Sequence, residues 1–123
     1  MRLQPTEKFE VQDHYEILAS YEAIREVVNG ITIDSAAVTA VDGKKVVRKG
    51  MPMGKLANGK YAPYSAAASD GSQNPTVILK ETIDVTDGDH IVGGYEMAKV
   101  ISERLPVTVD QALKDKMQLI QFA

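Results

Sequence analysis

From Ile31 onward, the chain alternates short runs of apolar residues with dense turn signals. Short runs rich in Val, Ile and Thr and bounded by Gly, Pro, Asn or Asp are typical of β-strands. The strands predicted in this way lie at residues 31–33, 37–41, 45–47, 76–79, 82–85, 91–92, 97–101 and 119–122. Strands that recur at intervals of about 8–12 residues favour a small barrel or sandwich. The predicted fold class is therefore mainly β.

Turn signals fix the connections between several of these strands. Asn58-Gly59 lies between residues 54–57 and 60–64, and this dipeptide readily supplies the two positive-φ residues of a type I′ turn, which predicts a β-hairpin. Asp42-Gly43 predicts a second hairpin turn in the same way. Near the C-terminus, Asp110 is placed to cap a short helix at residues 111–117.

The N-terminal part of the chain has a different pattern. Residues 1–12 are polar with scattered apolar side chains and no period, which predicts an arm. Ile17, Tyr21, Ile24 and Val28 follow at helical spacing, with Asp13 and Glu16 as a candidate capping box, and predict a helix over residues 14–28. The alternative interpretation makes residues 9–11 and 16–18 strands. We therefore divide the chain into residues 1–30, an arm with a possible helix, and residues 31–123, a β-rich domain.

Composition and charge narrow the possible partners. The 123 residues are 44% hydrophobic, include no Cys and carry a net charge of -3, which fits one soluble domain without disulfides or thiolate metal sites. No segment resembles a membrane helix or a secretory signal, so no membrane partner is expected. The net charge also argues against a nucleic-acid partner. One segment, residues 42–60, is nevertheless basic, because it contains a single acidic residue, Asp42, and six basic residues, Lys44, Lys45, Arg48, Lys49, Lys55 and Lys60. The simpler interpretation of this basic segment is that its charged side chains lie on solvent-exposed strand faces and turns.

Candidate chemistry is sparse. Asp84, Asp87, Asp89 and His90 form the densest polar cluster, but their spacing does not match an EF-hand loop, and a solvated turn is the simpler interpretation. A metal-assisted hydrolase built on the last three of these residues is one alternative function. Tyr61 and Tyr64, beside the basic run, suggest a second, a small nucleic-acid- or ligand-binding β-barrel in which the rings stack on bases. No catalytic motif is present, so we expect neither an enzyme nor a cofactor or metal site.

The middle of the chain resembles a known family. The residues that carry the resemblance are Gly50, Pro52 and Gly54 in a bent strand, Asn58 and Gly59 in the hairpin, Tyr61 and Tyr64 in the following strand, and Asp70 and Gly71 in a turn before Val77-Ile78-Leu79. This order is similar to that in head decoration proteins of tailed phages related to the lambda capsid-stabilising protein. The similarity covers residues 40–101, with a weaker likeness near residues 112–122.

The resemblance implies a β-clip-like fold and a structural role on the virion. Members of this family are expected to bind the expanded head as trimers at local threefold positions, with the major capsid protein as partner, and to resist the pressure of packaged DNA. The protein would be made in the host cytoplasm and end on the capsid surface. The resemblance also implies that the N-terminal arm becomes ordered when it binds the capsid shell. The candidate capsid-binding residues are therefore Arg2, Leu3, Gln4, Pro5, Phe9 and Val11.

Overall fold

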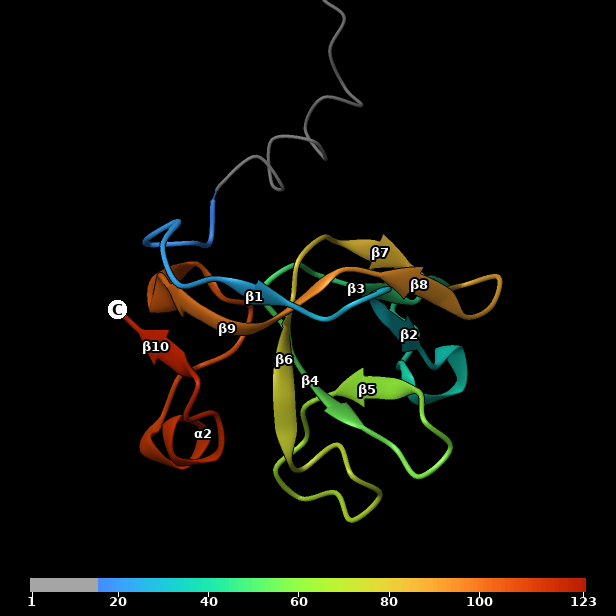
Figure 1. The fold of residues 1–123 in the computed structure, drawn as a ribbon. Helices are drawn as coiled ribbons and strands as arrows, with labels where there is room; N and C mark the ends of the chain where they lie inside the picture. Colours follow the sequence, from blue (N-terminus) through green and yellow to red (C-terminus); the bar gives the residue numbers. More distant parts are fainter. Residues whose placement is uncertain (1–15) are drawn as a thin grey trace, which may run out of the picture.

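The computed structural model describes residues 16–123 as a β-rich body with one short α-helix (Figure 1). The strands in chain order are β1 (Arg25–Glu26), β2 (Ile31–Ile33), β3 (Val46–Val47), β4 (Pro52–Lys55), β5 (Tyr61–Pro63), β6 (Pro75–Leu79), β7 (Ile83–Asp84), β8 (His90–Val92), β9 (Gly94–Val100) and β10 (Ile120–Phe122). Two 3₁₀ turns, η1 (Ser35–Ala37) and η2 (Ser102–Arg104), and the helix α2 (Gln111–Lys116) complete the elements. The prediction of a mainly β protein is confirmed.

Eight strands form one mixed sheet that closes on itself. Its order is β1-β9-β6-β4-β5-β2-β8, and β10 joins β9 in parallel. β8 stands at one end of this order, yet it runs through Gly93 directly into β9 near the other end. This continuity brings the two ends of the sheet together, which gives a barrel-like body. A separate two-stranded ribbon pairs β3 with β7.

The body has two hydrophobic cores, and β6 contributes to both. Val77 and Leu79 pack in one core with residues of β2, β4 and β8, whereas Ile78 packs in the other with residues of β9, α2 and β10. Successive side chains of a strand point to opposite faces, so a strand covered on both sides carries consecutive apolar residues. The unbroken apolar run Val77-Ile78-Leu79 thus reflects burial on both faces.

Local signals in the C-terminal third are confirmed. Asp110 adopts an extended conformation, and its Oδ1 accepts the Leu113 amide at 2.9 Å, which caps α2. The helix places Leu113 in the core with none of its side chain exposed. The closing strand β10 then pairs with β9 from Ile120 to Phe122.

The predicted Asn58-Gly59 hairpin is present, but its turn type differs from the prediction. β4 and β5 pair antiparallel, and the ladder ends where the Leu56 amide donates to the Lys60 carbonyl at 2.7 Å. Only Gly59 has a positive φ, of 88°, whereas a type I′ turn needs two such residues. Three residues, 57–59, therefore form the loop, with Gly59 in the left-handed position. The Asn58 side chain instead accepts the Lys60 amide at 2.9 Å.

The predicted helix at 14–28 is wrong in its described part, residues 16–28. Ile17 is almost fully buried while Tyr21 and Val28 are 75% and 84% exposed, so the helical spacing does not mark a common face. The backbone pairs with β9 instead. The Ile101 amide donates to the Ile17 carbonyl, and the Ala19 amide donates to the Lys99 carbonyl. Long-range pairing satisfies the backbone groups that a helix would have used.

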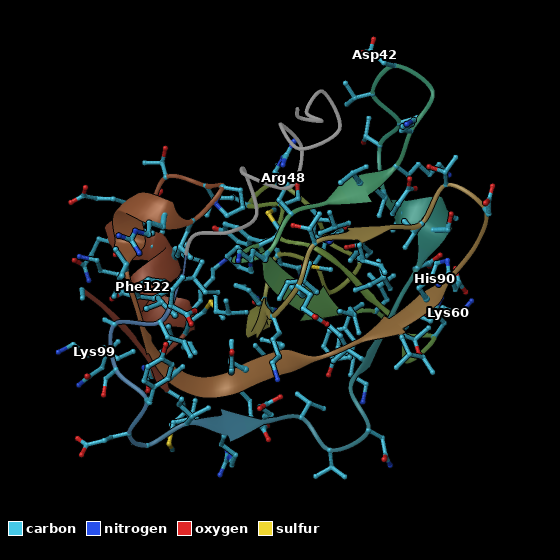
Figure 2. All side chains as sticks on the ribbon, turned by 90° about the horizontal axis from the view of Figure 1, so that it is seen from above. Asp42, Arg48, Lys60, His90, Lys99 and Phe122 are labelled. Atoms are coloured by element: carbon cyan, nitrogen blue, oxygen red, sulfur yellow. The ribbon has the colours of Figure 1, made fainter. Side chains whose placement is uncertain are left out.

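The predicted strand at 37–41 is also wrong. Asp34 caps a 3₁₀ turn at residues 35–37 by accepting the Ala36 amide at 3.0 Å, and the chain then reaches Val38 in the core without a strand. The turn signal that follows is confirmed. Asp42 and Gly43 have φ values of 55° and 78°, and Val41 bridges Lys44. The resulting hairpin tip projects from the body (Figure 2).

Candidate functional site

Three of the residues that carry the resemblance, Gly54, Asp70 and Gly71, lie where β4 crosses the loop that precedes β6. Gly54 in β4 and Gly71 in the loop lie against each other's backbone. A Cβ on Gly71 would be 2.2 Å from the Lys55 carbonyl oxygen, and a Cβ on Gly54 would be 2.7 Å from the Gly71 oxygen. Such approaches leave room only for glycine. The two glycines therefore let the strand and the loop pack backbone to backbone.

Asp70 shapes the loop at this crossing. Its Oδ1 accepts the Ser72 hydroxyl at 2.6 Å and the Ser72 amide at 3.0 Å, and Ser72 is buried. The hydrogen bond from the Ser72 hydroxyl, followed by that from its amide, lowers the pKa of Asp70 below its usual value. The hydrogen bonds thus favour the ionised carboxylate, which fixes the turn at residues 70–72.

Gly50 and Pro52 form the entry to β4. Gly50 has a φ of 91°, its amide donates to the Leu79 carbonyl at 2.8 Å, and a Cβ there would be 2.9 Å from Leu105 Cδ2. Pro52 is buried at the start of the strand, where its carbonyl accepts the Tyr64 amide. The predicted bent entry is confirmed by these contacts.

The tip of the hairpin is tied to the loop before β8. Lys60 Nζ lies 2.6 Å from Asp89 Oδ2, and Asp89 Oδ1 accepts the Ser35 amide at 2.8 Å. Asn58 donates to Asp34 Oδ2 at 3.3 Å. The Lys60 contact lowers the pKa of Asp89 and raises that of Lys60. We call Asp34, Ser35, Asn58, Lys60 and Asp89 the polar latch, because they join η1, the hairpin and the β7–β8 loop.

The acidic cluster does not form a metal centre. Asp89 is engaged in the polar latch, and Asp84 accepts the Thr86 amide at 2.8 Å and also its hydroxyl. The hydroxyl contact is the main reason that the pKa of Asp84 lies below its usual value. Across residues 16–123, no group of three or more His, Asp or Glu side chains is arranged to hold a metal ion. Nothing in this geometry supports a hydrolase.

The two tyrosines after the hairpin do not share one stacking surface. Tyr61 is half-buried and packs against the core that contains Val77, whereas Tyr64 packs against the core that contains Ile78. Lys116 Nζ lies 5.6 Å from the centre of the Tyr64 ring. Because the rings serve different cores, the structure does not support the base-stacking interpretation.

Two hollows mark the surface of the described body. The larger, of 550 Å³, is bounded by the β3 region, the end of β5, the loop after Tyr64, and Pro106. The smaller, of 450 Å³, lies between residues 20–23, β9 and the segment entering β10. We call the larger hollow the β3 groove. Nine of its lining residues are apolar and come from distant parts of the chain, namely Ala37, Val38, Val46, Val47, Met51, Ala62, Pro63, Ala68 and Pro106.

The candidate capsid-binding residues Arg2, Leu3, Gln4, Pro5, Phe9 and Val11 lie outside the described residues. The described chain starts at Glu16, whose carbonyl accepts Arg104 Nη1 at 2.7 Å. Within the part of the chain that the structure describes, the helices are too short or too polar to span a bilayer.

The comparison with protein families decides the identity of this body. The family model of the bacteriophage lambda head decoration protein D matches residues 16–118. The chain belongs to this family. Head decoration proteins are structural proteins of the phage capsid, so this decoration protein is a virion component that binds the capsid. A search of curated proteins finds no match to the chain.

The match spans every described element from β1 to α2, including the glycine crossing and the polar latch of this decoration protein. Sequence reasoning missed the latch, because Asp34, Lys60 and Asp89 are far apart in the chain. It also missed the crossing, although Gly54 within a strand signals close approach by another backbone.

Proposed function

We propose that the protein binds the expanded phage head as trimers at local threefold positions and stabilises the shell against the pressure of packaged DNA. The observation that carries this proposal is the family match, which spans residues 16–118 of the described body. Such a body suits the task. Its sheet packs against a hydrophobic core on each face of β6, which favours a body that resists local unfolding on the shell.

The proposed partner is the major capsid protein, reached by the N-terminal arm. An extended segment can add a strand to an exposed sheet edge, with main-chain hydrogen bonds providing affinity and alternate side chains filling pockets. In this proposal Leu3, Phe9 and Val11 fill the pockets, and Arg2, Gln4 and Pro5 set the path of the arm. In the proposed division, residues 1–30 are the N-terminal region, of which residues 17–26 already pack on β9, and residues 31–123 are the decoration domain. We infer a β-clip arrangement for that domain.

The role is structural rather than catalytic. The protein is made in the host cytoplasm and transferred to the capsid surface, without direct contact with nucleic acid. The family's capsid role supports this view, as do the contacts of Asp84 with Thr86 and of Asp89 with Lys60 and Ser35.

The first test is the copy number in virions. Quantitative mass spectrometry of purified particles should give nearly equal numbers of this chain and of the major capsid protein. Cryo-electron microscopy of the same particles should then show density at the local threefold positions. Absence of the chain from virions would refute the proposal.

The arm is tested with shells expanded in vitro. We expect a Leu3→Ser, Phe9→Ser and Val11→Ser variant to lose binding in a sedimentation assay, because the pockets would lose their apolar occupants. Thr6→Ser with Gln12→Ser is the matched control in the same segment and should bind as the parent does. Deletion of residues 1–12 should abolish binding while leaving the circular dichroism of the body unchanged. Unimpaired binding by the deletion variant would refute the proposal that the arm binds the capsid.

A further inference from the structure

The polar latch holds an Asn-Gly pair, the kind of dipeptide that is most prone to spontaneous deamidation. Asn58 and Gly59 stand at the exposed tip of the hairpin between β4 and β5. A Cβ added at Gly59 would meet nothing within 4 Å, so the pair is open to water. Because glycine has no Cβ, its backbone nitrogen can approach the preceding side chain closely. Asn58 is therefore a candidate site of covalent modification.

The reaction needs only water. The Gly59 amide gives up its proton to the solvent, and its nitrogen forms a bond to Cγ of Asn58. The bond from Cγ to Nδ2 breaks, and the leaving nitrogen takes up a proton and departs as ammonia. Water then opens the cyclic imide at one of its two carbonyl carbons. Hydrolysis at Cγ gives aspartate, whereas hydrolysis at the backbone carbonyl carbon gives an isoaspartyl linkage, in which the backbone runs through the former side chain.

Hydrogen bonds restrain this reaction in the folded protein. The Gly59 amide, which supplies the attacking nitrogen, donates to the Leu56 carbonyl at 3.0 Å. Asn58 Oδ1 accepts the Lys60 amide at 2.9 Å, and Nδ2 donates to Asp34 Oδ2 at 3.3 Å. The carboxamide must leave these partners to turn toward the Gly59 nitrogen. Because the contact with Asp34 belongs to the polar latch, opening of the latch frees the side chain to react.

We propose that Asn58 is a deamidation site that the polar latch protects: the side chain reacts when the latch opens, and the product keeps the latch open. The new carboxylate would replace the amide that faces Asp34, and two like charges this close repel each other. The isoaspartyl product also lengthens the backbone of the loop at residues 57–59. The modification thus makes a reversible opening of the hairpin tip permanent. This inference concerns the free protein and does not depend on the proposed function.

The other asparagines of the chain provide internal comparisons. Asn29 precedes Gly30 in the turn between β1 and β2, where the Gly30 amide donates to the Val27 carbonyl at 3.1 Å. This pair has a similar restraint on its attacking nitrogen but lies outside the latch. Asn74 precedes Pro75, which has no amide proton, so it cannot react in this way.

The test follows each asparagine separately in the full chain. Trypsin cleaves after Lys and Arg and puts the asparagines on different peptides, which are residues 26–44, 56–60 and 61–80. The protein is incubated in H₂¹⁸O and digested in ordinary water, so that only conversion during the incubation adds ¹⁸O to a peptide. Parallel samples in urea give the rate of the unfolded chain. We expect Asn58 to convert roughly tenfold or more slowly in the folded protein than in urea, because the carboxamide must leave two hydrogen bonds.

Variants open the latch without changing the reacting pair. Asp34→Ser keeps a side chain that can cap η1 but that is too short to reach Asn58. It should raise the Asn58 rate roughly three- to tenfold, the range expected for loss of one hydrogen bond. Asp89→Ala, which releases Lys60 from the other half of the latch, should raise the rate as well. Asp87→Ser is the matched control, because it removes an equal charge from the same loop before β8 and should leave the rate unchanged.

The parent chain tests the proposal even where circular dichroism shows that a variant is unfolded. Equal Asn58 rates in the folded and the urea-unfolded parent would overturn it. So would unchanged rates in folded Asp34→Ser and Asp89→Ala proteins, or an equal increase in Asp87→Ser, since charge rather than the latch would then control the reaction. The Asn29 rate should be the same in every variant, and the Asn74 peptide should take up no ¹⁸O.

A last variant tests the effect of the product. Asn58→Asp reproduces the aspartyl form, whereas Asn58→Ser removes the contact with Asp34 without adding a charge. We expect Tm at neutral pH to be lower for Asn58→Asp than for Asn58→Ser, because only the former places two carboxylates side by side. A Tm for Asn58→Asp equal to or above that of Asn58→Ser would refute the claim that the product keeps the latch open.

Discussion

Replacing Gly71 by alanine tests the backbone crossing that organises the family motif. The new Cβ would lie 2.2 Å from the Lys55 carbonyl oxygen and 3.4 Å from the Leu56 Cα, so β4 and the loop must separate. Gly71 also has a φ of 115°, a conformation that alanine rarely adopts. Backbone strain of this kind costs about 1–3 kcal/mol, and overpacking costs typically about 1–3 kcal/mol. We expect Gly71→Ala to lower the free energy of unfolding by roughly 2–6 kcal/mol.

Other glycines of the chain separate these two contributions. Gly59 and Gly88 have φ values of 88° and 148° but nothing within 4 Å of an added Cβ, so their alanine variants report backbone strain alone. Gly54 has no positive φ, and its Cβ would lie 2.7 Å from both the Gly71 oxygen and the Ser72 Cα, so Gly54→Ala reports the clash alone. The loss at Gly71 should exceed the loss at each of these three positions.

The assay is urea unfolding followed by far-ultraviolet circular dichroism, supported by thermal melts. The expected decrease in Tm for Gly71→Ala is on the order of 10–20 °C for a domain of this size. A loss no larger than that of Gly59→Ala and Gly88→Ala would show that the loop moves away from β4 at little cost. The backbone crossing would then not be a determinant of stability, and the reasoning would be refuted.

Three further predictions concern the core, the helix cap and the polar latch. Leu113→Ala should destabilise the protein by about 2–5 kcal/mol in urea unfolding, because the side chain is fully buried, whereas Leu119→Ala, at a residue 51% exposed, should change stability little. Asp110→Ala should cost about 1 kcal/mol through loss of the cap on the Leu113 amide, with Asp115→Ala, which removes only the Gln111 contact, as its control. Asp89→Asn should lower Tm at neutral pH, because the lowered pKa of Asp89 means that its carboxylate stabilises the fold at pH values above the unfolded pKa. The Tm difference from the parent should shrink as pH falls through the folded pKa of Asp89, and a difference independent of pH would contradict the role of its charge.

The sequence determined features that depend on neighbouring residues alone. Gly59 adopts the left-handed conformation that the hairpin turn needs, and the side chain of Asp110 caps the helix that follows it. The hairpin and α2 were therefore predictable from neighbouring residues. The run Val77-Ile78-Leu79 predicted a strand because its composition suits a sheet buried on both faces. The mainly β class follows from such signals together.

Only the tertiary structure decided features that depend on distant partners. The helical spacing from Ile17 to Val28 gave way to pairing with β9, because Ile17 and Ala19 found backbone partners about eighty residues away in the chain. Nor did the sequence show that Lys60 meets Asp89, or that Gly54 meets Gly71, since each contact requires pairing between strands of the sheet to bring the segments together. Local chemistry thus selected the elements, whereas the assembly of the sheet selected their partners, because pairing depends on the burial and backbone hydrogen bonding of the whole sheet.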